Sequence, residues 1–286
     1  MGKEGMDMGV MATAESVERF CKRAAKGKGN LYDMQRKMLC RTEDHPFTDL
    51  KEKDIQRLLH FYGLFKPESY KKAERHVKDW KEQHVYYHLE KEYERLKKMW
   101  QGPDVPVYLY PFHDIGGLFG RGKGGKGGAA FADAVYIFYG EPEEKDDWKA
   151  VLAHEYNHVC RIHRGKRSLK EVSLLESLII EGLGEYAVQQ LYGEKYTAVW
   201  TQRYSDRHLK QIWKKKYLHA IDIKGQEKHM DYLYGNRKQG FPKWAGYQLG
   251  YRMVESYHRS HPEETIRTLL QKSAEDIYHG SLFFGK

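Results

Sequence analysis

Apolar side chains recur every three to four residues through most of the first hundred positions, the spacing that places them along one face of a helix. We predict helices over residues 15–25 and 49–62, followed by one long charged helix over 67–100. Pro67 suits the first turn of that helix, and the segment GPDVP at 102–106 ends it. The amino-terminal region is therefore predicted to be helical, with a boundary at residue 102.

Beyond this boundary the pattern changes to that of short strands. The segments VPVYLYP at 105–111 and AVYIFY at 134–139 are rich in β-branched and aromatic residues, which favour strands. A glycine-rich loop separates them. We therefore predict a small sheet in this part of the chain.

Two further helices are predicted after the second strand. The first runs from about 147 to 165 and has an aspartate as its cap. The second begins at Ser168, with Glu171 three residues later as in a capping box, and ends before Gly193. These elements predict an α+β fold that is mostly helical, with a small sheet beside the helix at 147–165.

Composition narrows the class of protein. Hydrophobic residues make up 40% and aromatic residues 14%, as in a folded globular chain. The formal charge is +9, but the two signs are interspersed, so nucleic-acid binding is not favoured. Only three cysteines occur, which argues against a disulfide framework. The chain shows neither a signal-type amino terminus nor an apolar run of ~20 residues, so we expect no membrane segment and a cytoplasmic location.

The segment HEYNH at 154–158 carries the strongest chemical signal. His154 and His158 are four residues apart, so both imidazoles lie on one helix face and can converge on one cation, for which zinc is best suited. Glu155 follows the first histidine and can take a proton from a water bound to that zinc. The match lies on the apolar side of its helix, where ionisable groups are costly unless a metal or partner satisfies them.

A catalytic zinc site needs a third protein ligand. An extended HExxHxxGxxH motif is excluded, because Arg161 and Arg164 occupy the glycine and second histidine positions. In the next helix Glu181 and Glu185 share a face, so one can bind the metal while the other accepts a hydrogen bond from an imidazole, whereas Glu176 lies off that face.

Glycines occur inside the helix that carries Glu181 and inside a later predicted helix. Gly182 and Gly184 stand in a helix interior, where each costs ~1 kcal/mol relative to alanine, so we expect another helix to approach closely. Gly246 and Gly250 give a later helix a similar small-residue edge. Both helices are therefore predicted to make close contacts.

HEYNH followed by EGLGE at 181–185 resembles the gluzincins, the thermolysin-like zinc peptidases. The resemblance implies a zincin-like fold, one Zn²⁺ ion, Glu181 as the third ligand and Glu185 as the residue that orients His154. Glutamate at 185 replaces the aspartate of the family pattern. It also implies a peptide or protein substrate.

More narrowly, the chain is similar to the YjaZ-type bacterial family of predicted zinc-dependent proteases. The likeness covers roughly residues 30–260 and is firmest over 103–255. It rests on the segments HEYNHVCR, LLESLIIEGLGE, GPDVPVYLYP, GGAAFADAVYIF and LYGNRKQGFPKWAGYQLGYRMV. The predicted domains are thus a helical region over 1–102 and a zincin-like catalytic region over 103–286, which could also form one compact unit.

The glycine-rich segment GRGKGGKGG at 120–128 mimics a phosphate-binding loop. It departs from that motif because Gly127 replaces the Ser/Thr that binds magnesium, and a strand follows instead of a helix. Its end, with Gly128, Ala129, Ala130 and Phe131, precedes the metal helix much as the edge strand does in thermolysin-like enzymes. An extended peptide could add to it through main-chain hydrogen bonds.

A donor is also needed for the oxyanion formed during peptide hydrolysis. Tyr247, Tyr251 and His229 are candidates, with Tyr247 preferred, although a tyrosine on a helix more often serves the core. The other histidines, including His163, are predicted to lie at the surface. Two rival functions stay open: a non-enzymatic, metal-bound regulatory or binding protein, and a weak nucleic-acid binder.

Overall fold

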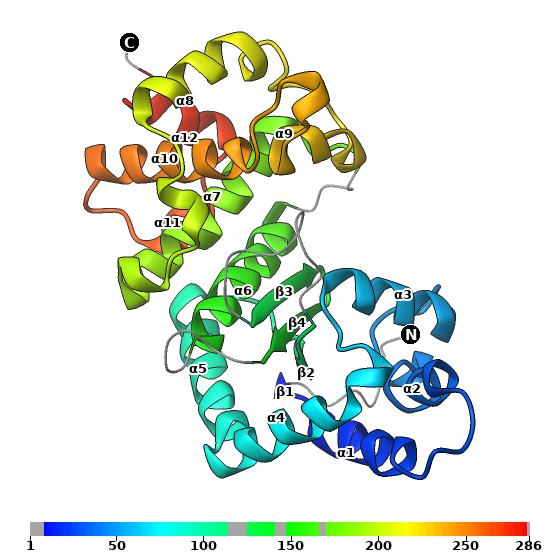
Figure 1. Ribbon diagram of the computed structural model, residues 1–286. Coiled ribbons are helices and arrows are strands. Elements are labelled where there is room, and N and C mark those ends of the chain that lie inside the picture. Colours follow the sequence, from blue (N-terminus) through cyan, green and yellow to red (C-terminus); the bar gives the residue numbers. More distant parts are fainter. Residues whose placement is uncertain (1–8, 114–124, 141–146, 166–169, 285–286) are drawn as a thin grey trace. The chain divides into compact units, whose positions relative to one another are not determined.

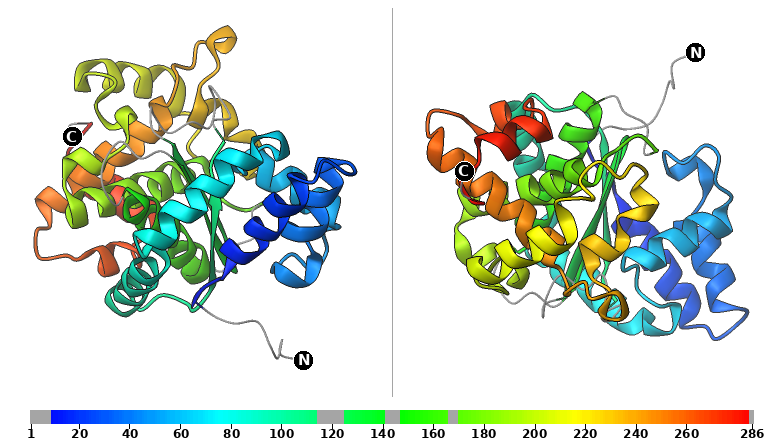
Figure 2. Two further views of the ribbon diagram at one scale, coloured as in Figure 1. Left: turned by 60° about the horizontal axis from the view of Figure 1, so that its bottom comes forward. Right: turned by 90° about the horizontal axis from the view of Figure 1, so that it is seen from above.

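The computed structural model describes residues 9–113, 125–140, 147–165 and 170–284. It is mostly helical with a small four-stranded sheet, which confirms the α+β prediction (Figures 1 and 2). The chain divides into two compact units, Met1–Glu155 and Tyr156–Lys286. The division falls inside one continuous helix, α6 (Trp148–Gly165), which contributes to both units. The predicted division at residue 102 stays a prediction.

The sheet belongs to the first unit and has the order β1-β2-β4-β3. Its strands are β1 (Gly9–Val10), β2 (Pro106–Pro111), β3 (Lys126–Phe131) and β4 (Ala134–Tyr139). β2 runs parallel to β1 and β4, and β3 is antiparallel to β4 at the edge of the sheet. Every residue of β2 and β4 is buried, as expected for apolar runs in the middle of a sheet. The prediction of two strands here is confirmed, and the segment at 128–131 lies in the edge strand.

Helices surround this sheet in the first unit (Figures 1 and 2). They are α1 (Thr13–Ala24), α2 (Leu31–Leu39), α3 (Glu52–Tyr62), α4 (Tyr70–Glu82) and α5 (Val85–Trp100), with short 3-10 turns at Thr42–Asp44 and Pro67–Ser69. The spacing of apolar residues did not predict α2, which begins directly after Gly29 and Asn30. Asn30 in fact caps this helix by accepting the backbone N–H of Asp33.

The prediction of one helix over 67–100 is wrong. The helical path is broken at His84, whose left-handed backbone (φ 52°) separates α4 from α5. α4 buries Val77 and Trp80 on its inner face, and α5 starts a new inner face with Val85 and Leu89. The strain at one residue is offset by the burial of apolar side chains on both helices.

The second unit is formed by helices. Besides the end of α6 they are α7 (Leu174–Tyr192), α8 (Asp206–Ile212), α9 (Met230–Tyr234), α10 (Ala245–Ser260), α11 (Ile266–Leu269) and α12 (Ala274–Gly280). Short helical turns connect them at Glu194–Tyr196, Val199–Gln202, Trp213–Tyr217, Gln226–Lys228 and Arg237–Gln239. Their buried side chains, which include Trp200, Trp213 and Tyr217, form a common hydrophobic core.

Helix α7 begins later than predicted. Its cap is Ser173, whose hydroxyl accepts the backbone N–H of Glu176. The observed cap therefore lies five residues after the predicted cap. Ser168 itself lies outside the described residues.

Helices α7 and α10 approach each other through glycines, as predicted for both. A side-chain Cβ at Gly182 would collide with the backbone of Gly250, and one at Gly250 would collide with the carbonyl of Leu178. The two small-residue edges thus face each other, which the sequence did not indicate. This contact fixes the position of α7, the helix that carries Glu181.

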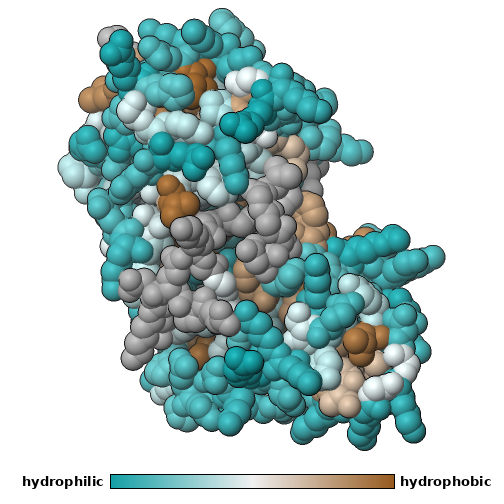
Figure 3. Space-filling model, in the orientation of Figure 1, coloured by the Kyte–Doolittle hydropathy of each residue, from teal (hydrophilic) through white to brown (hydrophobic). Residues whose placement is uncertain are grey.

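The face of the molecule drawn in Figure 3 is mostly hydrophilic, with scattered apolar patches. Several charges pair along their own helices, such as Asp33 with Arg36 and Glu92 with Arg95. Across the described ranges, no helix combines the length and apolar character that a membrane span requires.

Candidate metal centre

Helix α6 places the HEYNH segment in the protein interior. The relative solvent exposure is only 2% for His154, 1% for Glu155 and 6% for His158. Apolar neighbours on the same helix, such as Leu152 and Val159, are fully buried and hold it in place. The predicted buried position of the three ionisable residues is therefore correct.

The structure brings both imidazoles together with Glu181. One donor atom from each of His154, His158 and Glu181 lies within 4.8 Å of the other two. His158 Nε2 and Glu181 Oε2, in the same unit, are 3.5 Å apart. His154 precedes His158 by about one turn of the same continuous helix.

These donors suit a zinc ion. Two ligands at about 2.0–2.2 Å from a tetrahedral zinc stand roughly 3.4 Å apart, close to the separation of His158 and Glu181. Two imidazole nitrogens and one carboxylate form a catalytic type of ligand set, with a fourth position left for water. The residues present therefore fit the metal.

Glu155 lies against the edge strand of the sheet. A Cβ built at Gly128 would come 2.5 Å from Glu155 Cγ and 2.7 Å from its Oε1. The absence of a side chain at 128 therefore makes room for this carboxylate. The contact also places β3 beside the metal helix, which Figure 1 shows.

The four residues predicted to bind substrate all lie in β3. The Phe131 ring packs against Phe47 and Tyr62 at centroid distances of 4.9 and 5.8 Å, so its side chain belongs to an aromatic cluster. A contact with substrate would therefore come from the backbone of this strand. Its substrate-binding role stays a prediction.

Glu185 is buried in α7, one turn after Glu181. One of its carboxylate oxygens accepts the backbone N–H of Ala198 at 2.5 Å. This bond connects α7 to the start of the 3-10 turn Val199–Gln202, which contains Trp200. The role of Glu185 in orienting His154 stays a prediction.

Two of the candidate oxyanion donors, Tyr247 and His229, have different surroundings. Tyr247 is buried on α10, with its ring 5.3 Å from that of Trp200 and 5.4 Å from that of Tyr234. The catalytic role of Tyr247 stays a prediction. His229 is engaged through both nitrogens, with the hydroxyl of Ser177 at 2.8 Å and the carbonyl of Ile223 at 2.8 Å, so it serves the fold.

Cys160 lies two residues after His158 on the same helix. Burial is the largest cause that raises the pKa of this thiol, to about 12. It is therefore protonated at neutral pH and is neither a nucleophile nor a ready metal ligand. Cys160 is therefore not a candidate for acid–base chemistry or metal binding in this helix.

Arg161 and Glu176, which the sequence pattern did not assign to the metal site, form a partly buried ion pair next to this group. The guanidinium of Arg161 on α6 binds the carboxylate of Glu176 on α7. The placement of Glu176 off the metal-binding face is thus correct. A possible signal was the arginine on the same face of the helix as the paired histidines, opposite an acid in the next helix.

The candidate ligands lie in a region that matches a known protein family. The model of a family described as "Predicted Zn-dependent protease (DUF2268)" matches residues 85–279, which contain all three candidate ligands. The uncharacterized protein YjaZ of Bacillus subtilis (strain 168) is 35% identical over 206 residues, or 72% of this chain and 77% of YjaZ. The uncharacterized protein YjfC of the same organism is 28% identical over 120 residues, or 39% of this chain and 40% of YjfC. No solved structure matches the chain significantly.

Proposed function

Because this chain belongs to the family of predicted Zn-dependent proteases, we propose that it is a metallopeptidase that binds one zinc ion through His154, His158 and Glu181. The observation that supports this proposal most directly is the convergence of these three donors within 4.8 Å of one another. Two histidines from one helix and a glutamate from the next form the ligand pattern of the gluzincins.

Zinc at this position would polarise the scissile carbonyl and lower the pKa of a water to about 7. Glu155 accepts a proton from the attacking water and delivers it to the leaving amine. Its burial and its contact with the strand at Gly128 hold the carboxylate in one place. Glu185 orients His154, and the hydroxyl of Tyr247 donates to the oxyanion.

The substrate in this proposal is an extended peptide or a protein segment. β3 is one of the two edge strands of the sheet in the described part of the chain, and it lies against Glu155. An edge strand can pair with an extended peptide through main-chain hydrogen bonds. The peptide would then lie along residues 128–131, beside the general base.

The test measures bound zinc and cleavage of a broad peptide library by the parent and by Glu155→Gln. We expect about one zinc per chain in both, and turnover reduced at least about 100-fold in the variant, since the general base is lost. Glu194→Gln, an exposed glutamate outside the metal group, is the matched control and keeps both properties.

Two results would contradict the proposal in different ways. Full activity in Glu155→Gln would remove the general base from the mechanism. One zinc per chain with no cleavage of any library peptide by the parent would favour the non-enzymatic, metal-bound rival. His154→Ala identifies the site, because it should abolish stoichiometric zinc binding.

A further inference from the structure

Arg161 makes more polar contacts than a surface arginine would. It lies on α6, one turn after His158, and is only 5% exposed. Its Nε and Nη2 donate to the two carboxylate oxygens of Glu176 at 2.7 and 2.9 Å. This is the two-pronged geometry in which an arginine fixes both the distance and the orientation of its partner.

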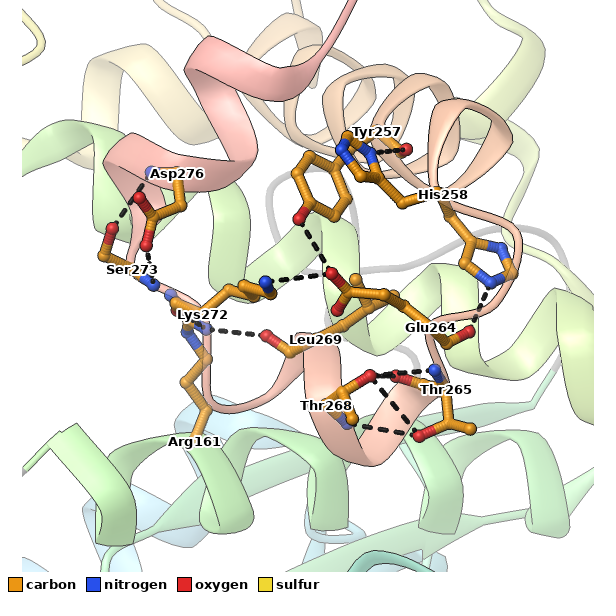
Figure 4. Close-up of polar contacts among 11 residues, drawn as sticks. Arg161, Tyr257, His258, Glu264, Thr265, Thr268, Leu269, Lys272, Ser273 and Asp276 are labelled. Carbon is orange, nitrogen blue, oxygen red and sulfur yellow. Dashed lines mark hydrogen bonds and ion pairs between the residues drawn. The ribbon is translucent and has the colours of Figure 1, made fainter.

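The third guanidinium nitrogen binds a different segment. Arg161 Nη1 donates to the carbonyls of Leu269 and Lys272, at 3.3 and 2.8 Å, where α11 ends (Figure 4). The first carbonyl belongs to the last residue of a short helix and the second lies just beyond it, where backbone acceptors need partners from outside the helix. One side chain thus connects α6 both to α7 and to the segment after α11.

The segment after α11 is connected to α10 through Glu264. Glu264 receives hydrogen bonds from Lys272 Nζ at 2.9 Å and from the hydroxyl of Tyr257 at 3.0 Å (Figure 4). Nε2 of His258 donates to the Glu264 carbonyl at 2.7 Å. Arg161 therefore binds a segment that is fixed to α10, the same helix against which the glycine face of α7 packs.

The Arg161–Glu176 pair and the contact of His158 with Glu181 are neighbouring contacts between α6 and α7. His158 lies opposite Glu181, and three residues further along α6 Arg161 lies opposite Glu176, five residues back along α7. The helices therefore run in opposite directions and have two neighbouring points of contact. At ~1.5 Å per residue these points are only ~4.5 Å apart along α6 and ~7.5 Å along α7.

We propose that Arg161 is a positioning residue for the metal centre. By holding Glu176, it fixes how far α7 is shifted and rotated against α6, and so keeps the Glu181 carboxylate at binding distance from the ion held by the two histidines. This role rests on the proposed zinc site. A lysine cannot replace it, because one ammonium cannot bind both carboxylate oxygens and the two carbonyls.

The test is the zinc affinity of Arg161→Lys, measured by calorimetry on the full chain. We expect the dissociation constant to rise at least about tenfold, the size of effect that residues supporting metal ligands commonly show. The visible spectrum of the Co²⁺-loaded protein is the second measurement. Its absorption bands should shift or weaken, because the carboxylate ligand is no longer held in register.

Arg252→Lys is the matched control for lost stability. Arg252 on α10 is also partly buried, and it pairs with Asp206 at 2.7 Å and with Glu255, but none of these residues lies on α6 or α7. This variant should lose thermal stability as an ion pair weakens, while its zinc affinity stays within about twofold of the parent. Loss of affinity in Arg161→Lys alone would therefore separate positioning from general destabilisation.

Glu176→Gln provides a second variant should Arg161→Lys fail to fold, since it keeps the size of the side chain and one hydrogen-bond acceptor. We expect its zinc dissociation constant to rise roughly threefold or more. Parent-like affinity and a parent-like Co²⁺ spectrum in a folded variant would overturn the positioning role and leave the zinc site intact. A parent that binds no zinc would overturn the proposed function and this role together.

Discussion

At the scale of single residues, a missing side chain decides where Glu155, the proposed general base, can lie. Gly128 is in an ordinary strand, yet a Cβ there would overlap with the middle of the Glu155 side chain, which is 1% exposed. Gly127, its neighbour, would place a Cβ no closer than 3.4 Å to Phe112, which is ordinary contact. The position of Glu155 therefore requires a glycine at 128 but not at 127.

Gly128→Ala should displace the Glu155 carboxylate and lower peptide turnover at least about tenfold, while zinc binding is kept. Gly127→Ala is the control and should retain activity. Steady-state cleavage and zinc content of both variants check this. Equal activity in the two would show that the contact between β3 and Glu155 has no catalytic role.

His45 shows how burial sets a protonation state. The sequence prediction that such histidines lie at the surface is wrong here, because His45 is 2% exposed. Its Nε2 donates to the Leu39 carbonyl and its Nδ1 accepts from the hydroxyl of Tyr136, both at 2.8 Å. Burial lowers the pKa of the His45 ring below 6.5, which favours the neutral form in which one nitrogen donates and the other accepts.

This lowered pKa predicts a loss of stability in acid. As the pH falls below 6.5, the unfolded chain takes up a proton at this histidine while the folded chain does not, until the pH reaches the lowered pKa. One histidine contributes a slope of up to about 1.4 kcal/mol per pH unit. Urea unfolding of the metal-free protein at pH 7.5 and 5.5 measures this decrease in the free energy of unfolding. The decrease between the two pH values should be smaller in His45→Gln than in the parent. Equal losses would contradict the prediction.

At the scale of elements, the metal group depends on how α7 is held. α7 meets α10 through Gly182 and Gly250, where the backbones are too close for any side chain. It meets α6 through the Arg161 pair. A change in either contact should move Glu181 relative to the histidines.

Gly250→Ala should therefore reduce the free energy of unfolding by at least about 2 kcal/mol, because the helices must separate to admit a methyl group. Gly165→Ala, at the end of α6 with no described atom within 4 Å of the added Cβ, should change it by less than about 0.5 kcal/mol. Denaturant unfolding compares them. A neutral Gly250→Ala would mean that the α7–α10 contact relaxes at little cost.

At the scale of the whole molecule, zinc should couple to folding, since the ligands come from two helices that only the folded chain brings together. At a free zinc concentration 100 times its dissociation constant, the free energy of unfolding should rise by about 2.7 kcal/mol. Thermal unfolding with and without a chelator measures this. His154→Ala should show no such shift, and an equal shift in that variant would place the metal elsewhere.

Features that depend on neighbours along the chain could be predicted before the fold was known. The position of α6, the shared face of His154 and His158, the two strands and the glycine edges all follow from spacings of a few residues, and they appear in the structure. Glu181 could be proposed for the same reason, since one face of α7 carries the acids.

Contacts between residues far apart in the sequence, in contrast, could be identified only in the folded chain. Arg161 binds the carbonyl of Lys272, 111 residues away, and His45 binds Tyr136, 91 residues away. The break at His84 likewise depends on what each half of the segment can bury. Helical periodicity shows which face of a helix is apolar, but not which element will cover it, because packing is settled only when all the faces compete for the same core.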